Sequence, residues 1–176
     1  MKQINKYIQE RLHINKDTGN HSYNYHPKTR DELLELVDKL IEERGNDADL
    51  NDIDTSEITY MSSMFNGSPF NGDISEWDVS NVKNMAYMFA NSKFNNDISK
   101  WNVSNVKDMD SMFRKSKFDG DISKWNVSKV KNMDYMFCYS KFNGDISEWD
   151  VSNLEDMGYI FYKSPLEKNP PKWYAK

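Results

Sequence analysis

The 176-residue chain has one cysteine, no long apolar run and fewer cationic than anionic side chains. Cys138 cannot form an internal disulfide, and a lone thiol is typical of a reducing compartment. No stretch approaches the roughly 18 apolar residues of a membrane span, and the opening segment MKQINKYIQERLHINK lacks the apolar run of a secretory signal. We therefore expect a cytoplasmic protein that does not contact a membrane.

The deficit of positive charge restricts the partners of the protein. Its 23 Lys and Arg residues and 28 Asp and Glu residues give a formal net charge of −5. Nonspecific binding to nucleic acid depends on many cations that neutralise phosphates, so we expect no direct nucleic-acid contact. Residues 1–45 hold eight residues of each sign, which places the whole negative excess in residues 46–176.

A repeat of 24 residues organises most of the chain. The first well-formed row reads FNGDISEWDVSNVKNMAYMFANSK. A degenerate row from Asn46 precedes the well-formed rows, and a truncated row, LEKNPPKWYAK, follows them from Leu166. All five Trp and all nine Phe fall at repeat positions, so the array of repeats is the fold itself. The four well-formed rows begin at Phe70, Phe94, Phe118 and Phe142.

Within a row, the apolar spacing changes from one typical of a strand to one typical of a helix. Ile74, Trp77 and Val79 follow L-x-x-L-x-L spacing, and the last two share one strand face. Ser80 then stands where a hydroxyl can cap a short helix. We therefore predict an α/β fold, a β-α solenoid of five coils with a parallel β ladder. The predicted helical stripe is Val82, Met85, Met88 and Phe89.

The segments WDVSNVKNMAYMF, WNVSNVKDMDSMF, WNVSKVKNMDYMF and WDVSNLEDMGYIF resemble the repeat of mycoplasma-type bacterial surface lipoproteins, in the BspA-like leucine-rich-repeat group. The resemblance covers residues 46–176. It implies a right-handed, leucine-rich-repeat-like solenoid that is not catalytic and that presents a binding surface. Because no lipid-attachment cysteine stands near the start, an intracellular use of this scaffold is favoured, and the Lys, Asn, Asp and Ser usage resembles AT-rich bacteria and their phages.

Residues 1–45 are placed to cover the first coil as a helical hairpin cap. The apolar residues between Ile4 and Leu12 predict one helix, and a capping box over Thr29–Glu32 predicts the start of a second. Residues 46–165 form the five-coil solenoid, and residues 166–176 form a truncated C-terminal capping repeat.

Most regular columns of the array have a structural interpretation. The Trp column alternates with Val, which predicts that the indoles are buried rather than exposed for stacking on ligands. The column Asp73, Asp97, Asp121 and Asp145 is expected to stabilise turns, with a calcium site as a weaker alternative. No Ser-His-Asp or Cys-His pairing, phosphate loop or dinucleotide fingerprint occurs, so we predict no enzyme, catalytic residue, metal or cofactor.

The predicted strand face varies between repeats where the core does not, and it is our first candidate for partner binding. Its two outward columns carry Glu, Lys, Asp and Asn, and the Ser80 and Asn81 columns extend it. Tyr87, Tyr135, Tyr159 and Arg114 offer a second candidate surface. The residues of the two outward columns are Glu76, Asp78, Lys100, Asn102, Lys124, Asn126, Glu148 and Asp150.

These features predict a non-catalytic scaffold of bacterial or phage origin that binds other proteins through the strand face. An alternative is an inhibitor encoded by a phage or prophage, similar in its role to anti-CRISPR proteins. Its acidic solenoid would occupy the nucleic-acid groove of a basic defence nuclease. The protein is expected to be a monomer or an end-to-end dimer.

Overall fold

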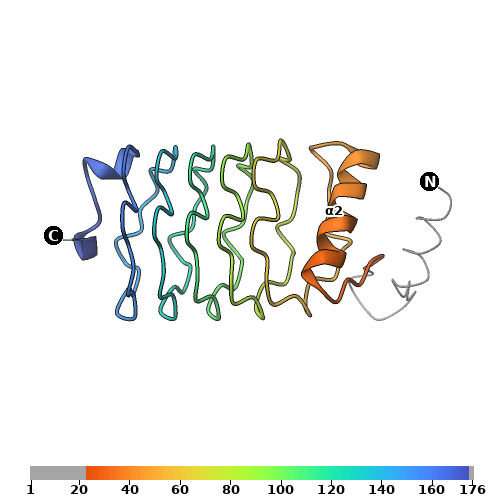
Figure 1. Cartoon of the computed structure of the whole chain (residues 1–176), viewed down its shortest axis with the longest axis horizontal. Helices are drawn as coiled ribbons and strands as arrows, with labels where there is room; N and C mark the ends of the chain where they lie inside the picture. Colours follow the sequence, from red (N-terminus) through yellow and green to blue (C-terminus); the bar gives the residue numbers. More distant parts are fainter. Residues whose placement is uncertain (1–22, 175–176) are drawn as a thin grey trace.

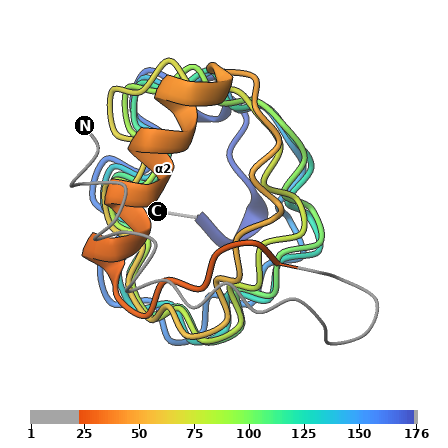
Figure 2. The same cartoon turned by 90° about the vertical axis from the view of Figure 1, so that its right-hand side faces the viewer.

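The computed structural model describes residues 23–174 and shows a solenoid whose coils stack along one axis (Figure 1). Viewed along that axis, the coils superimpose into one closed outline, and helix α2 lies over the N-terminal coil (Figure 2). Parallel backbone bridges between coils join residues 24 positions apart, as expected from the sequence repeat, and a further bridge joins Tyr25 to Ile53 of the first coil. The prediction of a stacked repeat solenoid is therefore confirmed. The main column of bridges runs through Tyr60, Asn84, Asp108, Asn132 and Asp156.

Three helical elements are assigned within residues 23–174: α2 (Arg30–Arg44), and the short 3-10 helices η1 (Pro165–Glu167) and η2 (Lys172–Tyr174). The N–H of Glu32 donates to Oγ1 of Thr29 at 3.2 Å, which confirms the predicted cap of α2. One face of α2 is buried against the first coil. The predicted helix around Ile4–Leu12 lies outside the described residues. The buried side chains of α2 are Leu33, Leu36, Val37 and Leu40.

The predicted helix in each coil is wrong. Where we expected a helix over Val82–Phe89, the chain forms consecutive tight turns around one bridge residue, Asn84. The predicted strand at Trp77–Val79 is also absent, because these residues join two turns, one closed by the N–H of Trp77 on the carbonyl of Ile74 and one by the N–H of Val82 on the carbonyl of Val79. Across the coils of the described chain, pairing consists of isolated bridges rather than extended strands.

Hydrogen bonding between coils explains why no helix forms. The N–H of Tyr87 donates to the carbonyl of Asp110 in the next coil at 2.8 Å, and the N–H groups of Met85 and Phe89 do the same with Asp108 and Met112. Tyr87 also has a φ of 59°, in the left-handed region, which a right-handed helix cannot accommodate. The parallel ladder therefore runs through the segment where a helix was predicted. We call residues 60–67, 84–91, 108–115, 132–139 and 156–163 the ladder segments.

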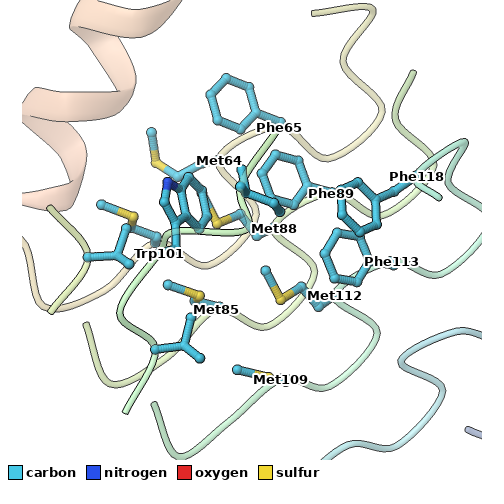
Figure 3. Close-up of a cluster of buried hydrophobic side chains, with 14 of the residues drawn as sticks. Met64, Phe65, Met85, Met88, Phe89, Trp101, Met109, Met112, Phe113 and Phe118 are labelled. Carbon is cyan, nitrogen blue, oxygen red and sulfur yellow. The ribbon is translucent and has the colours of Figure 1, made fainter. Parts of the chain in front are cut away.

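Two phenylalanine columns fill the interior of the solenoid (Figure 3). Phe89 stacks on Phe113 of the next coil with ring centroids 5.6 Å apart, and it also stacks at 4.4 Å on Phe94, the first residue of the next row. Full burial of one such side chain contributes about 1.5–3 kcal/mol. Methionines of the ladder segments pack beside these rings (Figure 3). Every coil therefore shares its core with both neighbours.

The tryptophan column is buried, as predicted. Trp101 is 4% exposed, and its Nε1–H donates to the carbonyl of Ile74 in the preceding coil at 3.1 Å. Trp125 and Trp149 make the equivalent bond. The indole therefore supplies apolar burial and also links two coils, because the carbonyl of Ile74 accepts both this bond and the N–H of Trp77 from its own coil.

The glycines before the aspartate column are not needed for a positive φ. Within residues 23–174, Gly45 and Gly67 alone among glycines have positive φ. A Cβ atom on Gly72 would instead lie 2.0 Å from the carbonyl oxygen of Ala48 and 2.6 Å from the Phe70 ring. The small residue is required there because the backbone of the previous coil and an aromatic ring approach closely.

Candidate functional site

The predicted binding face lies in the part of each coil formed by the turns of residues 73–81 and their repeat equivalents, which we call the turn side. All eight of its predicted residues are exposed. The charged groups of Glu76, Lys100, Lys124 and Glu148 make no hydrogen bond or ion pair within residues 23–174. This first column is therefore free to contact a partner, as the prediction requires.

The second predicted column stabilises the fold. Oδ1 of Asp78 accepts a hydrogen bond from the N–H of Ser80 at 2.9 Å, and Oδ1 of Asn102 accepts from Ser104 at 3.2 Å. Asn126 and Asp150 repeat this contact in their coils. Ser80 is thus the amide donor of a turn, and its predicted role as a helix cap is wrong. Asp and Asn both occur in this column because either side chain can accept the same N–H.

The neighbouring asparagine column also holds the coils together. Nδ2 of Asn81 donates to the carbonyl of Ser56 at 2.8 Å, and Asn105 and Asn153 make the equivalent bond to the preceding coil. Lys129 stands at this position in one coil and donates to Oδ1 of Asn105 instead. Most polar side chains of the turn side therefore act within the molecule.

The aspartate column has the predicted turn-stabilising role. Oδ1 of Asp97 accepts from the N–H of Ser99 at 2.9 Å, and Asp73, Asp121 and Asp145 do the same in their coils. Hydrogen bonds from Ser99 lower the pKa of Asp97 below its ordinary value, so the carboxylate stays ionised. The described part of the chain contains no group of three or more His, Cys, Asp or Glu side chains placed to hold a metal ion.

The outward side chains of the ladder segments include a group of aromatic and cationic residues on the last three coils. The side chains of Tyr135 and Tyr159 occupy the same repeat position and stack with centroids 5.3 Å apart at an interplanar angle of 9°. Tyr162 meets Tyr159 and Tyr139 edge-on, at 5.8 and 5.6 Å. The four rings are exposed, and they form a continuous aromatic surface.

Three cations lie over these rings. The guanidinium carbon of Arg114 is 5.7 Å from the centroid of Tyr135. Nζ of Lys163 is 5.1 Å from the Tyr139 ring and 5.4 Å from the Tyr162 ring. A hydrogen bond with Tyr139 raises the pKa of Lys163 above its ordinary value, so its charge is retained. We call this group the tyrosine–cation cluster; its members are Arg114, Lys115, Tyr135, Tyr139, Tyr159, Tyr162 and Lys163.

Our second predicted surface is part of this cluster. Tyr135, Tyr159 and Arg114 belong to it, whereas Tyr87 is separated from the stacked pair because Ser111 occupies the position between them. The sequence reasoning missed Tyr139 because it treated the segment as a helix. Aligning the rows of 24 would have placed Tyr139 directly between Lys115 and Lys163 in one column.

The buried Cys138 lies beneath this cluster in the ladder segment 132–139. Burial raises the pKa of its thiol, so the side chain is an apolar filler rather than a reactive thiolate.

Within residues 23–174, no helix combines the length and apolar character needed to span a bilayer.

Comparison with known protein families shows which family this chain resembles. A family model described as "Mycoplasma protein of unknown function, DUF285" matches residues 35–138 and, in a second placement, residues 92–175. The two placements together cover most of α2, the five coils and the C-terminal segment. No curated protein and no solved structure matches the chain.

Proposed function

The chain belongs to the family described as Mycoplasma protein of unknown function, DUF285, and we propose that it is a non-catalytic scaffold that binds another protein through the tyrosine–cation cluster. We further propose that its repeat is a right-handed member of the BspA-like leucine-rich-repeat group. The motifs around Trp77, Trp101 and Trp125 support that assignment.

One observation carries the proposal: four exposed tyrosines are already held in fixed positions by stacking and by cations. Tyrosine and arginine are enriched among the residues that dominate protein interfaces, because they bury a large apolar area and still offer polar groups. Rings that are ordered before binding lose little conformational freedom when a partner arrives. The stacked pair Tyr135 and Tyr159 and the cation–π contacts of Lys163 support this ordering.

The turn-side face supports binding less strongly. Its free column consists of long, flexible Glu and Lys side chains, which are depleted at the centres of interfaces. Its Asp and Asn column is already engaged with backbone amides. Charge reversal at Asp78 would therefore disturb a turn as well as a surface, whereas charge reversal at Glu76 changes the surface alone.

A photo-cross-linking amino acid placed at position 135 or at position 124 tests the proposal. Both positions are exposed, but Tyr135 lies in the cluster and Lys124 lies on the turn-side face. In cells of the organism whose genome encodes the protein, we expect one discrete cross-linked species from position 135 and none from position 124. The reverse result would move the binding site to the turn-side face.

The inhibitor of a basic defence nuclease remains a second candidate because of the aspartate column. Five exposed aspartates, one per coil, line the turn side. They are Asp49, Asp73, Asp97, Asp121 and Asp145. Such a surface would bind a basic groove with strong salt dependence, whereas a partner held by aromatic contacts would remain bound at about 0.5 M salt. A salt-sensitive partner lost on Glu76→Lys with Glu148→Lys would favour the inhibitor.

A further inference from the structure

The last ladder segment, residues 156–163, has backbone N–H groups that no following coil accepts, unlike every earlier ladder segment. In the preceding coil, the N–H groups of Met133, Tyr135 and Phe137 donate to the carbonyls of residues 156, 158 and 160, at 2.8–2.9 Å. The same pattern joins each earlier ladder segment to the next. These N–H groups all point toward the C-terminal end of the solenoid.

In the last ladder segment, these forward donors have no further coil to receive them. The N–H groups of Met157, Tyr159 and Phe161 find no acceptor among residues 23–174. The N–H of Lys163 donates to Oε2 of Glu167 at 3.1 Å, so the C-terminal segment replaces the missing coil at this one position. Unpaired backbone donors are costly wherever water is excluded, and they therefore favour an added strand.

This edge offers donors without matching acceptors. The carbonyl of Met157 accepts from the N–H of Ile160, and the carbonyl of Tyr159 accepts from the N–H of Tyr162, both within the same coil. An occupant must therefore supply carbonyl groups at alternate residues. The forward edge of a second copy presents only N–H groups and cannot supply them.

An apolar surface lies beside the open edge. Met157 is 39% exposed, whereas the equivalent Met85, Met109 and Met133 are each 0% exposed. Leu154 is partly buried, although its equivalent in the preceding coil, Val130, is 1% exposed. Each earlier coil is covered at these positions by the coil that follows it.

The C-terminal segment covers only part of this coil end. Trp173 stacks on Trp149 at 6.4 Å, and the ring of Tyr174 meets Phe161 edge-on at 5.0 Å. Met157 and Tyr159 remain exposed beyond this cover.

The N-terminal end is closed by comparison. Helix α2 lies over the first coil (Figure 2), and Nε of Arg30 donates to the carbonyl of Ser62 at 2.9 Å. Ser62 occupies the repeat position of Ala86 and Asp110, whose carbonyls accept from the preceding coil. A second copy therefore cannot present its first coil without displacing α2.

We propose that the C-terminal coil accepts a segment of another polypeptide as a further ladder segment. The occupant would place carbonyls of alternate residues on the N–H groups of Met157 and Tyr159. It would also place apolar side chains, spaced i, i+3 and i+4 as in Met109, Met112 and Phe113, over the exposed apolar surface. This is strand addition with a repeat-like segment as the ligand. It goes beyond the proposed function because it uses the backbone N–H groups and the apolar surface of the coil end, and not the aromatic and cationic side chains of the tyrosine–cation cluster.

The chain itself supplies a suitable probe. The peptide of residues 106–117, VKDMDSMFRKSK, carries the required pattern and no cysteine. We expect this fluorescein-labelled peptide to bind the full-length protein in an anisotropy titration, and to slow hydrogen exchange at the amides of Met157 and Tyr159. A peptide in which serine replaces Met109, Met112 and Phe113 should bind at least about tenfold more weakly, since it loses the apolar contacts.

Variants of the protein separate this site from the cluster. Met157→Lys should weaken peptide binding at least about tenfold, since it places an unpaired ammonium group against the apolar occupant. Tyr60→Lys, at an exposed position on the first coil, should leave binding unchanged. Loss of partner cross-linking from position 135 concerns the proposed function alone and would not affect this titration.

Three outcomes would overturn the inference. The first is no peptide binding to a protein whose thermal unfolding is cooperative. The second is equal binding to the Met157→Lys variant. The third is a concentration-dependent dimer in sedimentation that Met157→Lys abolishes, because a second copy would then be the occupant of the coil end.

Discussion

The two sides of each coil use opposite parts of the chain to hold the solenoid together. On the turn side, side chains such as Asp97 and Asn105 accept or donate the bonds that shape the coil. On the ladder side, backbone groups form those bonds, as between Met109 and Asn132. Polar side chains still form turns there, since Asn84 and Asp108 accept the N–H groups of Ala86 and Asp110. Within residues 23–174, no such bond to a turn amide is formed at the repeat position that holds Ser63, Tyr87, Ser111, Tyr135 and Tyr159.

This comparison shows that variation between repeats is a poor guide to a binding face by itself. Asp78 and Asn102 differ in charge, yet each accepts the N–H of the serine two residues later. Tyr135 and Ser63 also differ, but no shared backbone contact requires either side chain. Variation points to function where the side chain has no bond in the fold, which favours the ladder side.

The largest expected difference between core and surface is in the free energy of unfolding of two variants, Phe113→Ala and Tyr135→Ala. Phe113 is fully buried between Phe89 and Phe137, so its truncation should lower the free energy of unfolding by about 3–5 kcal/mol. Tyr135→Ala should cost less than about 1 kcal/mol, because the ring is exposed. Urea denaturation measures both. Equal losses would mean that the tyrosine–cation cluster is part of the core.

A smaller effect is expected for Trp125→Phe. The substitution keeps an aromatic ring but removes the Nε1–H that bonds the carbonyl of Ile98, which keeps only its bond from the N–H of Trp101. The lost hydrogen bond and the cavity left by the smaller ring should together lower the free energy of unfolding by about 1–3 kcal/mol. Trp173→Phe is the matched control, since Trp173 makes the equivalent bond to Ile146 but is only partly buried, and its loss should be smaller. An unchanged midpoint for Trp125→Phe would contradict the role of the indole N–H.

Substitution of the glycine column should show a difference between coils. Gly72→Ala forces a Cβ against the Ala48 carbonyl and should destabilise by about 1–3 kcal/mol. Gly120→Asn should be better tolerated, because Asn96 occupies this position in the preceding coil and only the edge of the Phe118 ring must move. Differential scanning calorimetry of both variants checks the ranking, and a larger loss for Gly120→Asn would refute it.

The smallest effect is the acid sensitivity of the turn side. Hydrogen bonds from Ser75, Ser99 and Ser147 hold the pKa values of three aspartates below their ordinary range. These are Asp73, Asp97 and Asp145, in the same order. Because each pKa is lower in the folded state, this stabilisation is present above the unfolded value of about 3.9 and is lost as the pH falls through the folded value.

Thermal melts between about pH 7 and pH 2 should therefore show a falling midpoint below about pH 4. Asp97→Asn should flatten this dependence slightly without lowering the midpoint at neutral pH, since Asn102 and Asn126 form the same turn. If Asp97→Asn leaves the acid limb as steep as in the parent protein, the carboxylate does not contribute to it.

Sequence reasoning recovered the periodic features of the fold. The buried tryptophans, the aspartate turns and the cap at Thr29 follow from repeat spacing and local hydrogen-bonding chemistry. The path of the backbone could not be derived from the sequence, because the spacing of Val82, Met85 and Phe89 fits a helix as well as the consecutive turns that form instead. Left-handed conformations at Tyr87 and Ser111 arise from bonds to the next coil, and no local preference of these residues indicates them.

The candidate site was recovered in part for the same reason. Tyr135, Tyr159 and Arg114 were recognised as exposed aromatic and cationic residues. The contacts of Tyr139 and Tyr162 depend on neighbouring coils and on the turn geometry, so a helical assignment could not bring them together.

The most direct test of the central claim compares two double variants in one affinity capture from the lysate of the organism that encodes the protein. Tyr135→Ser with Tyr159→Ser removes the stacked pair, and Glu76→Lys with Glu148→Lys reverses the free charges of the turn side. We expect the first variant to lose the partner that the parent protein retains, and the second to keep it, with both melting near the parent temperature. Retention by the tyrosine variant together with loss by the charge variant would contradict the account.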